Sequence, residues 1–288
     1  MKWYILRNPK ARQASALRLW PKIERQIKAS GQAYEGQDVR NRKEMLQQMQ
    51  LYLKEGAQNF LILGGDGSIN AAANALLGQS FRPVDELILA QVPLGWGNHW
   101  RPNTAGFRPW KGLAQGLRQP KASYQHVGLV SWQRGQKTYQ RYFIHLVQIG
   151  WLAQYYQSLQ KKAPKNIRLL TKWQFFQSWK QQQILSPAQM TLNGQKQALA
   201  PFFNLAVGLQ NPKESFSWSS QEKKAHLGQL LFPQALLNGP KSSPKLVQDI
   251  QLELPSHWPI SIDGDPIIRS GTKLHLQLLP QQLRLLNF

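Results

Sequence analysis

The chain has 288 residues, of which 42% are hydrophobic, no cysteine, and a formal net charge of +22 from 36 Lys and Arg against 14 Asp and Glu. This length and apolar content allow one large or two modest folded domains and argue against global disorder. The lack of cysteine excludes disulfides and thiolate chemistry, and it removes the usual soft ligands of a zinc site.

In the first 120 residues, strand-like segments alternate with helix-like segments. Short apolar runs predict strands at 2–7, 60–63 and 87–92. Apolar or small residues at helical spacing predict helices at 17–27, 39–53, 69–77 and 109–117. Because such alternation is typical of parallel βαβ units, we predict an α/β domain with a parallel sheet at 1–120.

The pattern changes after residue 121. Two strand-like runs, at 123–133 and 138–150, flank RGQK (134–137) as a predicted hairpin, and a helical region rich in basic and aromatic residues follows at about 151–183. From Met190 onward come short strand-like runs separated by Asn, Gly and Pro, among them QLLF (229–232), and this pattern is typical of a β-sandwich. We therefore predict a second, β-rich domain at 121–288, whose last strand is a candidate to return to the first domain.

The charge is unevenly distributed. Residues 87–213 contain no Asp or Glu but 16 Lys and Arg. Such a surface attracts polyanions, whether nucleic acid, anionic lipid headgroups or phosphorylated ligands, although a role in solubility alone is the simpler reading. No nucleic-acid-binding motif is present, so nucleic acid is not expected as a partner.

The stretch LILGGDGSINAAANALLG (61–78) joins a predicted strand to a predicted helix through a Gly-Gly-Asp-Gly turn. The free N–H groups and dipole of a helix start favour an anion such as phosphate, and glycines let the backbone approach it closely. Asp66 in this turn is explained by a metal, a sugar hydroxyl or an ordinary Asx turn. The pattern matches neither the P-loop nor the Rossmann fingerprint.

Two more loops follow predicted strands. They are RNPKAR (7–12) and the glycine-bearing PLGWGNHW (93–100). Because the ends of parallel strands lie at one edge of a sheet, where ligands bind, these loops and the Gly-Gly-Asp-Gly turn are candidates for one nucleotide cradle.

These motifs resemble those of the bacterial lipid kinases related to diacylglycerol kinase and sphingosine kinase. That family has Asn-Pro after its first strand, then Gly-Gly-Asp-Gly-Thr, then Pro-x-Gly-Thr-x-Asn-Asp, and a β-sandwich domain that carries an Asp-Gly-Glu motif. The corresponding segments here are Asn8-Pro9, GGDGSINAAANAL (64–76), PLGWGNHW (93–100), QIGWLA (148–153) at the opening of the β-sandwich domain, and SIDGDP (261–266). Asn70 and Asn74 in the first of the glycine segments match two asparagines in the helix that follows the family's Gly-Gly-Asp-Gly-Thr motif. In order and spacing they span nearly the whole chain.

The resemblance implies transfer of the γ-phosphate of ATP to a lipid hydroxyl, with Mg²⁺ as cofactor and a diacylglycerol-like or sphingoid lipid as acceptor. Asp265 would be the catalytic base and Asp263 its neighbour in the catalytic site, and Asp66 and Asp263 would be candidate metal ligands. The implied nucleotide-binding residues are Asn8, Arg12, Gly64, Gly65, Asp66, Gly67, Ser68, Gly95, Gly97 and Asn98.

The chain departs from the family pattern at several motif positions. Trp96 replaces a threonine, His99 and Leu152 replace acids, and His226 to Gly228 replace a metal-binding Asp-Asp-Gly. A catalytically inactive relative that binds nucleotide or anionic lipid is therefore the alternative. NAD kinases share the Gly-Gly-Asp-Gly turn and the two-domain plan, but their Asn-Glu or Asn-Asp pair is hard to place in a stretch without acids.

The segment KKAPKNIRLLTKWQFFQSWK (161–180) combines six Lys and Arg with four Trp and Phe and has no acid. This composition is typical of helices that lie on an anionic membrane surface, but also of a helix that packs its aromatic residues inward. The chain shows neither a signal peptide pattern nor a long apolar span, so we predict a cytoplasmic, peripherally membrane-associated protein.

Overall fold

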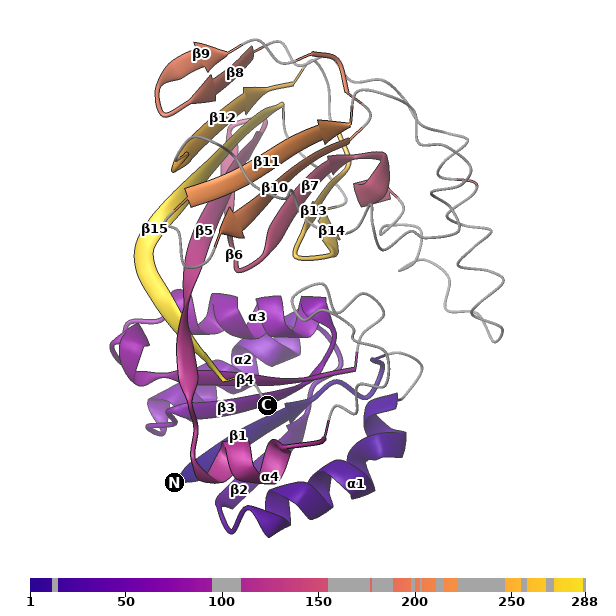
Figure 1. The fold of residues 1–288 in the computed structure, drawn as a ribbon, viewed down its shortest axis with the longest axis vertical. Helices are drawn as coiled ribbons and strands as arrows, with labels where there is room; N and C mark the ends of the chain where they lie inside the picture. The colour runs from indigo at the N-terminus through magenta and orange to yellow at the C-terminus, as the bar shows by residue number, and fades with distance from the viewer. Residues whose placement is uncertain are drawn as a thin grey trace. The chain divides into compact units, whose positions relative to one another are not determined.

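The computed structural model describes residues 1–11, 15–94, 110–154, 177, 189–197, 200–202, 204–210, 215–221, 247–254, 258–267 and 272–286. The chain divides into two compact units, Met1–Gln125 with Pro280–Phe288, and His126–Leu279. Strands β5 (Ala122–Arg134) and β15 (Lys273–Leu286) contribute residues to both units (Figure 1). Among the described residues, no helix has the length and apolar content needed to span a membrane.

The first unit is built on a parallel sheet with the strand order β2–β1–β3–β4–β15. Its first four strands along the chain are β1 (Lys2–Arg7), β2 (Ala33–Asp38), β3 (Asn59–Gly64) and β4 (Ile88–Pro93). Every residue of β3 and β4 is buried. Continuous burial is expected for central parallel strands that are covered on both faces, and it explains why both strands are mainly apolar, with Asn59 and Gln91 as their polar residues.

Helices cover both faces of this sheet (Figure 1). They are α1 (Ser15–Ala29), α2 (Arg42–Lys54), α3 (Asp66–Leu77) and α4 (Leu113–Arg118), with a short 3₁₀ turn, η1 (Val84–Glu86), before β4. Alternate residues of β1 pack on opposite faces of the sheet, because successive side chains of a strand point to opposite sides. Ile5 belongs to the core that includes Ile23 of α1 and Leu117 of α4, whereas the ring of Tyr4 lies 4.6 Å from that of Tyr52 in α2. Burial, assisted by the carboxylate of Glu35, raises the pKa of Tyr52 to about 12.

Strand β2 is absent from the sequence prediction. Its residues, AYEGQD, are mostly exposed, and it lies at the edge of the described sheet, paired with β1 alone. The helix predicted at 39–53 starts at Arg42, because Asn41 caps it by accepting a hydrogen bond from the backbone N–H of Glu44 at 3.0 Å. A polar edge strand needs no apolar run, and therefore it gives no apolar signal in the sequence.

The second unit contains an antiparallel sheet ordered β11–β10–β7–β13–β14. These strands are β7 (Leu146–Gly150), β10 (Asn204–Gln210), β11 (Ser215–Gln221), β13 (Ile260–Ile262) and β14 (Asp265–Ile267). A second set of strands pairs β5 with β6 (Lys137–Phe143), β15 with β12 (Asp249–Glu253), β12 with β8 (Gln189–Leu192), and β8 with β9 (Gln195–Gln197).

Apolar residues from both sets of strands form one core. Val147 and Val207 enter it from the first sheet, and Ile250 and Leu276 from the second set. The predicted fold class, an α/β domain with a parallel sheet followed by a β-rich domain, is thereby confirmed. In detail, the single strand expected from 138 to 150 is two strands, β6 and β7. Most of the helical region expected at 151–183 and the strand expected at 229–232 lie outside the described residues.

Candidate functional site

The Gly-Gly-Asp-Gly turn leads directly from β3 into α3. Gly64 is the last residue of β3, Gly65 is the N-cap of the helix, and no side chain caps it. Within the part of the chain that the structure describes, no N-cap side chain bonds to the first N–H groups of α3, and these groups together with the helix dipole favour an anion. A Cβ atom at Gly64 would lie 2.5 Å from Ser68 Oγ and 2.6 Å from Ser68 Cβ, so the backbone there passes too close to the helix for any side chain.

Asn8, directly after β1, joins this turn. Its Nδ2 donates a hydrogen bond to Ser68 Oγ at 3.1 Å, and its backbone N–H donates to the carbonyl of Leu63 at 2.9 Å. The Oδ1 atom of Asn8 accepts from the backbone N–H of Lys10 at 3.0 Å. The loop after the first strand is thus held against the start of α3 by an asparagine that the sequence analysis selected.

The loop after β4 also begins beside Gly64. In the register of the two strands Gly64 is opposite Pro93, and the carbonyl of Gly64 accepts from the N–H of Leu94 at 2.9 Å and from Nε2 of Gln91 at 3.0 Å. Gln91 is fully buried and was not selected from the sequence, where it interrupts an apolar strand. The ends of β1, β3 and β4 therefore meet at one edge of the sheet. The remaining predicted nucleotide-binding residues, Arg12, Gly95, Gly97 and Asn98, lie outside the described residues.

Asp66 and Ser68 lie in the first turn of α3 and are 9% and 8% exposed. The helix that carries them is tied to its neighbour, because Nη1 of Arg42 at the start of α2 donates to Oδ1 of Asn70 at 2.9 Å. Asn74 Nδ2 donates in turn to the carbonyl of Asn70 at 2.8 Å. The two asparagines belong to the family motif at 64–76, but Arg42 was not selected from the sequence, in which an Arg at the start of one helix gives no sign of its partner in another.

The positive charge at the end of β1 is already compensated. Arg7 Nε lies 2.7 Å from Asp38 Oδ1, and the guanidinium group lies over the ring of Trp20 at 4.2 Å. Near this pair, a hydrogen bond from the Tyr34 hydroxyl lowers the pKa of Glu24. Arg7 is therefore a poor candidate for neutralising phosphate, whereas the neighbouring Lys10 is exposed.

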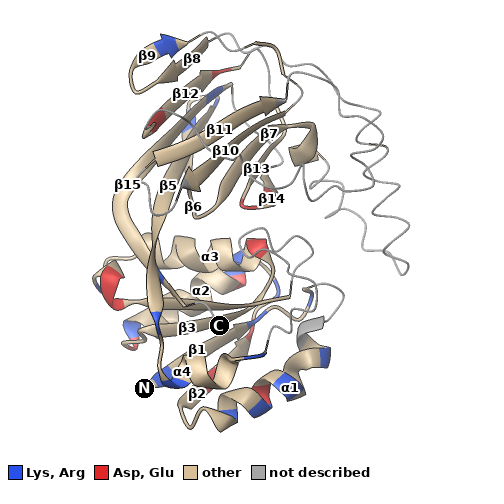
Figure 2. Ribbon diagram, viewed as in Figure 1, with Lys and Arg blue, Asp and Glu red and all other residues tan. Residues whose placement is uncertain are grey.

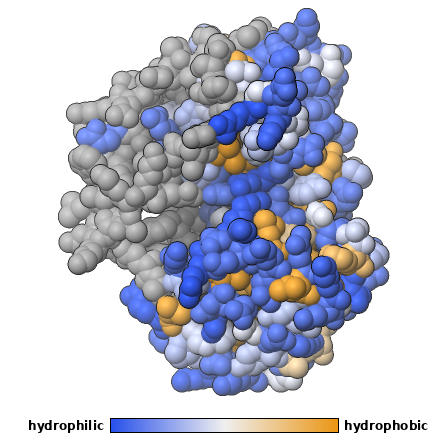
Figure 3. Space-filling view, turned by 180° about the vertical axis from the view of Figure 1, so that it is seen from behind, coloured by the Kyte–Doolittle hydropathy of each residue, from blue (hydrophilic) through white to orange (hydrophobic). Residues whose placement is uncertain are grey.

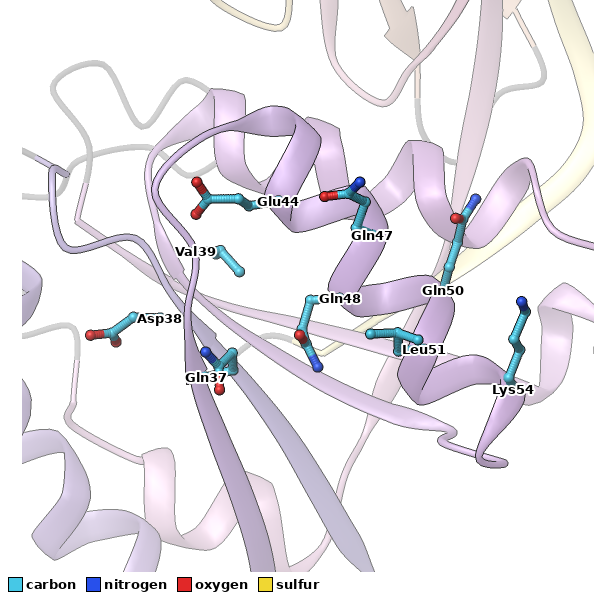
Figure 4. Close-up of a pocket in the computed structure, with 9 residues that line it drawn as sticks. All are labelled: Gln37, Asp38, Val39, Glu44, Gln47, Gln48, Gln50, Leu51 and Lys54. Carbon is cyan, nitrogen blue, oxygen red and sulfur yellow. The ribbon is translucent and has the colours of Figure 1, made fainter.

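A separate pocket of about 500 Å³ lies between the end of β2 and the side of α2 (Figure 4). Its lining side chains are mostly polar: four are glutamines and three are charged. The lining residues are Gln37, Asp38, Val39, Glu44, Gln47, Gln48, Gln50, Leu51 and Lys54. None of them belongs to the three loops, so this pocket is not part of the predicted phosphate site.

In the second unit, Asp263 and Asp265 flank the tip of the β13–β14 hairpin. Asp263 is 3% exposed, and its carboxylate accepts three backbone hydrogen bonds, from Ile144 at 2.9 Å, His145 at 2.9 Å and Leu146 at 2.8 Å. These bonds favour a structural role for Asp263, which would hold the hairpin to the start of β7. Asp265, at the start of β14, instead faces a side chain, because its Oδ2 accepts from Nη1 of Arg141 at 2.9 Å.

The two predicted Mg²⁺ ligands, Asp66 and Asp263, differ in how well they suit a metal ion. Figure 2 marks acidic positions at the start of α3 and at the β13–β14 hairpin. Among the residues that the structure describes, no group of three or more His, Cys, Asp or Glu side chains lies close enough to hold a metal ion. Both oxygens of Asp263 are engaged by backbone N–H groups. Asp66 therefore fits better, in a site where phosphates and water supply the other oxygen ligands that Mg²⁺ prefers.

Comparisons with known proteins agree with the family resemblance in the sequence and with the observed fold. Residues 2–112 match the diacylglycerol kinase catalytic domain, which confirms the resemblance drawn from the motifs. No curated protein matches the chain in sequence. A crystal structure described as a diacylglycerol kinase from Bacillus anthracis str. Sterne has a TM-score of 0.66 at 14% identity, covering 100% of this chain and 97% of that chain. Another structure from the same organism has a TM-score of 0.68 at the same identity and coverage. At this identity the similarity shows the fold alone.

Proposed function

On the premise that residues 2–112 form a diacylglycerol kinase catalytic domain, we propose that this protein is a lipid kinase. It transfers the γ-phosphate of ATP to a hydroxyl of a diacylglycerol-like or sphingoid lipid. The acceptor oxygen forms a new bond to phosphorus, the bond from the γ-phosphorus to its bridging oxygen breaks, ADP leaves, and the hydroxyl proton passes to a carboxylate. Phosphoryl transfer of this kind depends mainly on positioning and charge neutralisation.

The meeting of three strand ends supports this proposal most strongly. Asn8 is hydrogen-bonded to Ser68, and the carbonyl of Gly64 accepts from the first residue after β4. In the proposal the nucleotide phosphates bind at the uncapped start of α3, along Gly64, Gly65, Gly67 and Ser68. Arg12, Gly95, Gly97 and Asn98 complete the nucleotide site. Lys10, which is exposed, supplies positive charge together with Arg12, and Mg²⁺ bound beside Asp66 would neutralise the phosphates further.

Asp265 is the proposed base that accepts the proton of the lipid hydroxyl. Its side chain is 22% exposed, whereas Asp263 is almost completely buried and its carboxylate accepts three backbone hydrogen bonds. Within the proposal, Asp263 therefore shapes the hairpin that carries the base.

One assay decides between an active kinase and an inactive relative. Purified protein is incubated with labelled ATP, Mg²⁺ and a panel of diacylglycerol, monoacylglycerol and sphingoid acceptors. Transfer of label to any of these lipids supports the proposal. If no acceptor is labelled while the protein still binds nucleotide, the inactive relative is the correct reading.

Replacing Asp66 with alanine is expected to abolish the thermal stabilisation that ATP or ADP gives to the protein. The carboxylate lies in the first turn of α3, where the proposal puts the metal-bound phosphates. Differential scanning fluorimetry with nucleotide and Mg²⁺ measures this effect. Asp85→Ala, which removes an exposed carboxylate from the same unit, is the matched control and is expected to keep the full shift. A normal shift in Asp66→Ala would remove Asp66 from the site.

We also propose that the protein meets its acceptor at an anionic membrane surface. The segment 161–180, which lies outside the described residues, carries six Lys and Arg. Each such residue near an anionic surface contributes about 1 kcal/mol, screened by salt. On the face drawn in Figure 3, the described residues are mainly hydrophilic with small, separate apolar patches. The proposed source of affinity is the charge of this segment together with its Trp and Phe residues.

Replacement of Lys161, Lys162, Lys165 and Lys172 by Gln is expected to reduce sedimentation with anionic vesicles strongly. Wild-type binding should weaken as salt rises and should be slight on neutral vesicles. The control replaces four exposed lysines elsewhere and changes the net charge equally, at Lys43, Lys121, Lys137 and Lys196. If the two quadruple variants bind equally, this segment is not the membrane-binding surface.

A further inference from the structure

The tip of the β13–β14 hairpin has a fixed conformation. Ile262 is paired with Asp265, and the two residues between them, Asp263 and Gly264, have φ values of +49° and +74°. Two successive residues with positive φ are characteristic of the type I′ turn that joins tightly paired strands. The three backbone hydrogen bonds to Asp263 tie this turn to the start of β7. The Cα atom of Asp265 is therefore held in place by the turn and by the hydrogen bonds of Asp263 to residues 144–146.

The carboxylate of Asp265 is held by a residue that is distant in sequence. Arg141, on β6, lies 124 residues earlier, and its Nη1 atom is 2.9 Å from Asp265 Oδ2. The side chains of Arg141 and Asp265 are 12% and 22% exposed. Among the ion pairs of the described residues this pair is the least exposed. The low exposure of this pair matters because ion pairs on the surface contribute little to the free energy of folding. When one partner of a mostly buried pair is removed, the other is left as an uncompensated charge.

We propose that Arg141 is a positioning residue for Asp265. Its guanidinium group fixes the carboxylate in one orientation, so that the base meets the acceptor hydroxyl in a constant geometry. A planar group with several donors is suited to this task, and an ammonium group would hold the carboxylate less firmly. Misplacement of a reacting group by about 1 Å can cost on the order of a hundredfold in rate. This inference rests on the proposed function, because it assumes that Asp265 is the base.

Arg141→Gln is expected to lower kcat at least about tenfold and to leave the KM for ATP within about twofold of wild type. Arg141→Lys should recover part of the lost kcat, because it restores the positive charge. The double variant Arg141→Gln with Asp265→Asn should be no slower than Asp265→Asn alone, because Arg141 acts through the aspartate. Lys273→Gln, which breaks the exposed Lys273–Glu253 pair in the same unit, is the matched control and should keep wild-type kcat.

Three results would distinguish an error in this inference from an error in the proposed function. Full kcat in Arg141→Gln, in a wild type that is active, would overturn this inference and leave the proposed function intact. Equal losses in Arg141→Gln and Arg141→Lys, both with lowered unfolding midpoints, would also overturn it by indicating a purely structural role. A wild type that labels no acceptor would overturn the proposed function and this inference with it.

Discussion

Replacing Asp265 by Asn is expected to lower kcat by about 10² to 10⁴, the usual contribution of a general base. The amide keeps the size of the carboxylate but cannot accept the proton of the lipid hydroxyl. The KM for ATP should change little, because the proposed phosphate site lies at the start of α3 and not at the β13–β14 hairpin. Steady-state kinetics with labelled ATP and the best acceptor of the panel measure both constants.

Two further variants sharpen this test. Glu253→Gln makes the same acid-to-amide change in the same unit, at a side chain that is 48% exposed, and it should leave kcat unchanged. Asp265→Glu restores the residue that the family motif carries at this position, and it should keep or raise activity. Equal turnover in wild type and Asp265→Asn would show that the base lies elsewhere.

Gly64→Ala is expected to weaken nucleotide binding at least about tenfold, a change of about 1.4 kcal/mol. The new Cβ atom would lie 2.5 Å from Ser68 Oγ, so it would displace Ser68, whose hydroxyl accepts the hydrogen bond from Asn8 that joins the loops after β1 and β3. Overpacking of this kind should also lower the free energy of unfolding by about 1–3 kcal/mol. Titration calorimetry with ADP and chemical denaturation measure the two effects separately.

Gly36→Ala is the matched control for this substitution. A Cβ atom there would meet only ordinary contacts, at 3.9 Å from Ile5, and Gly36 lies in the exposed edge strand β2. Nucleotide affinity and stability should therefore stay close to those of the wild type. Wild-type affinity in a folded Gly64→Ala variant would contradict the placement of the phosphates at this turn.

The position of the candidate phosphate site could be predicted because its signals are local. An apolar strand, a glycine turn and a helix of small residues follow one another within the stretch 61–78. Each of these preferences operates over a few residues, and in a parallel sheet the ends of successive strands must lie at one edge. The sequence alone therefore predicted the α/β fold of the first unit and the loops at its sheet edge. It did not predict β2, because an exposed edge strand carries no apolar pattern.

Only the tertiary structure decided how the two aspartates near the C-terminus differ. In sequence they are alike, separated by one glycine in SIDGDP. In the folded chain Asp263 accepts three backbone hydrogen bonds from residues 144–146, and Asp265 pairs with Arg141. These partners lie more than a hundred residues away along the chain, and they are brought together by the pairing of β13 with β7. Local sequence patterns carry no information about contacts between strands that are so far apart, because those contacts exist only once the sheet has formed.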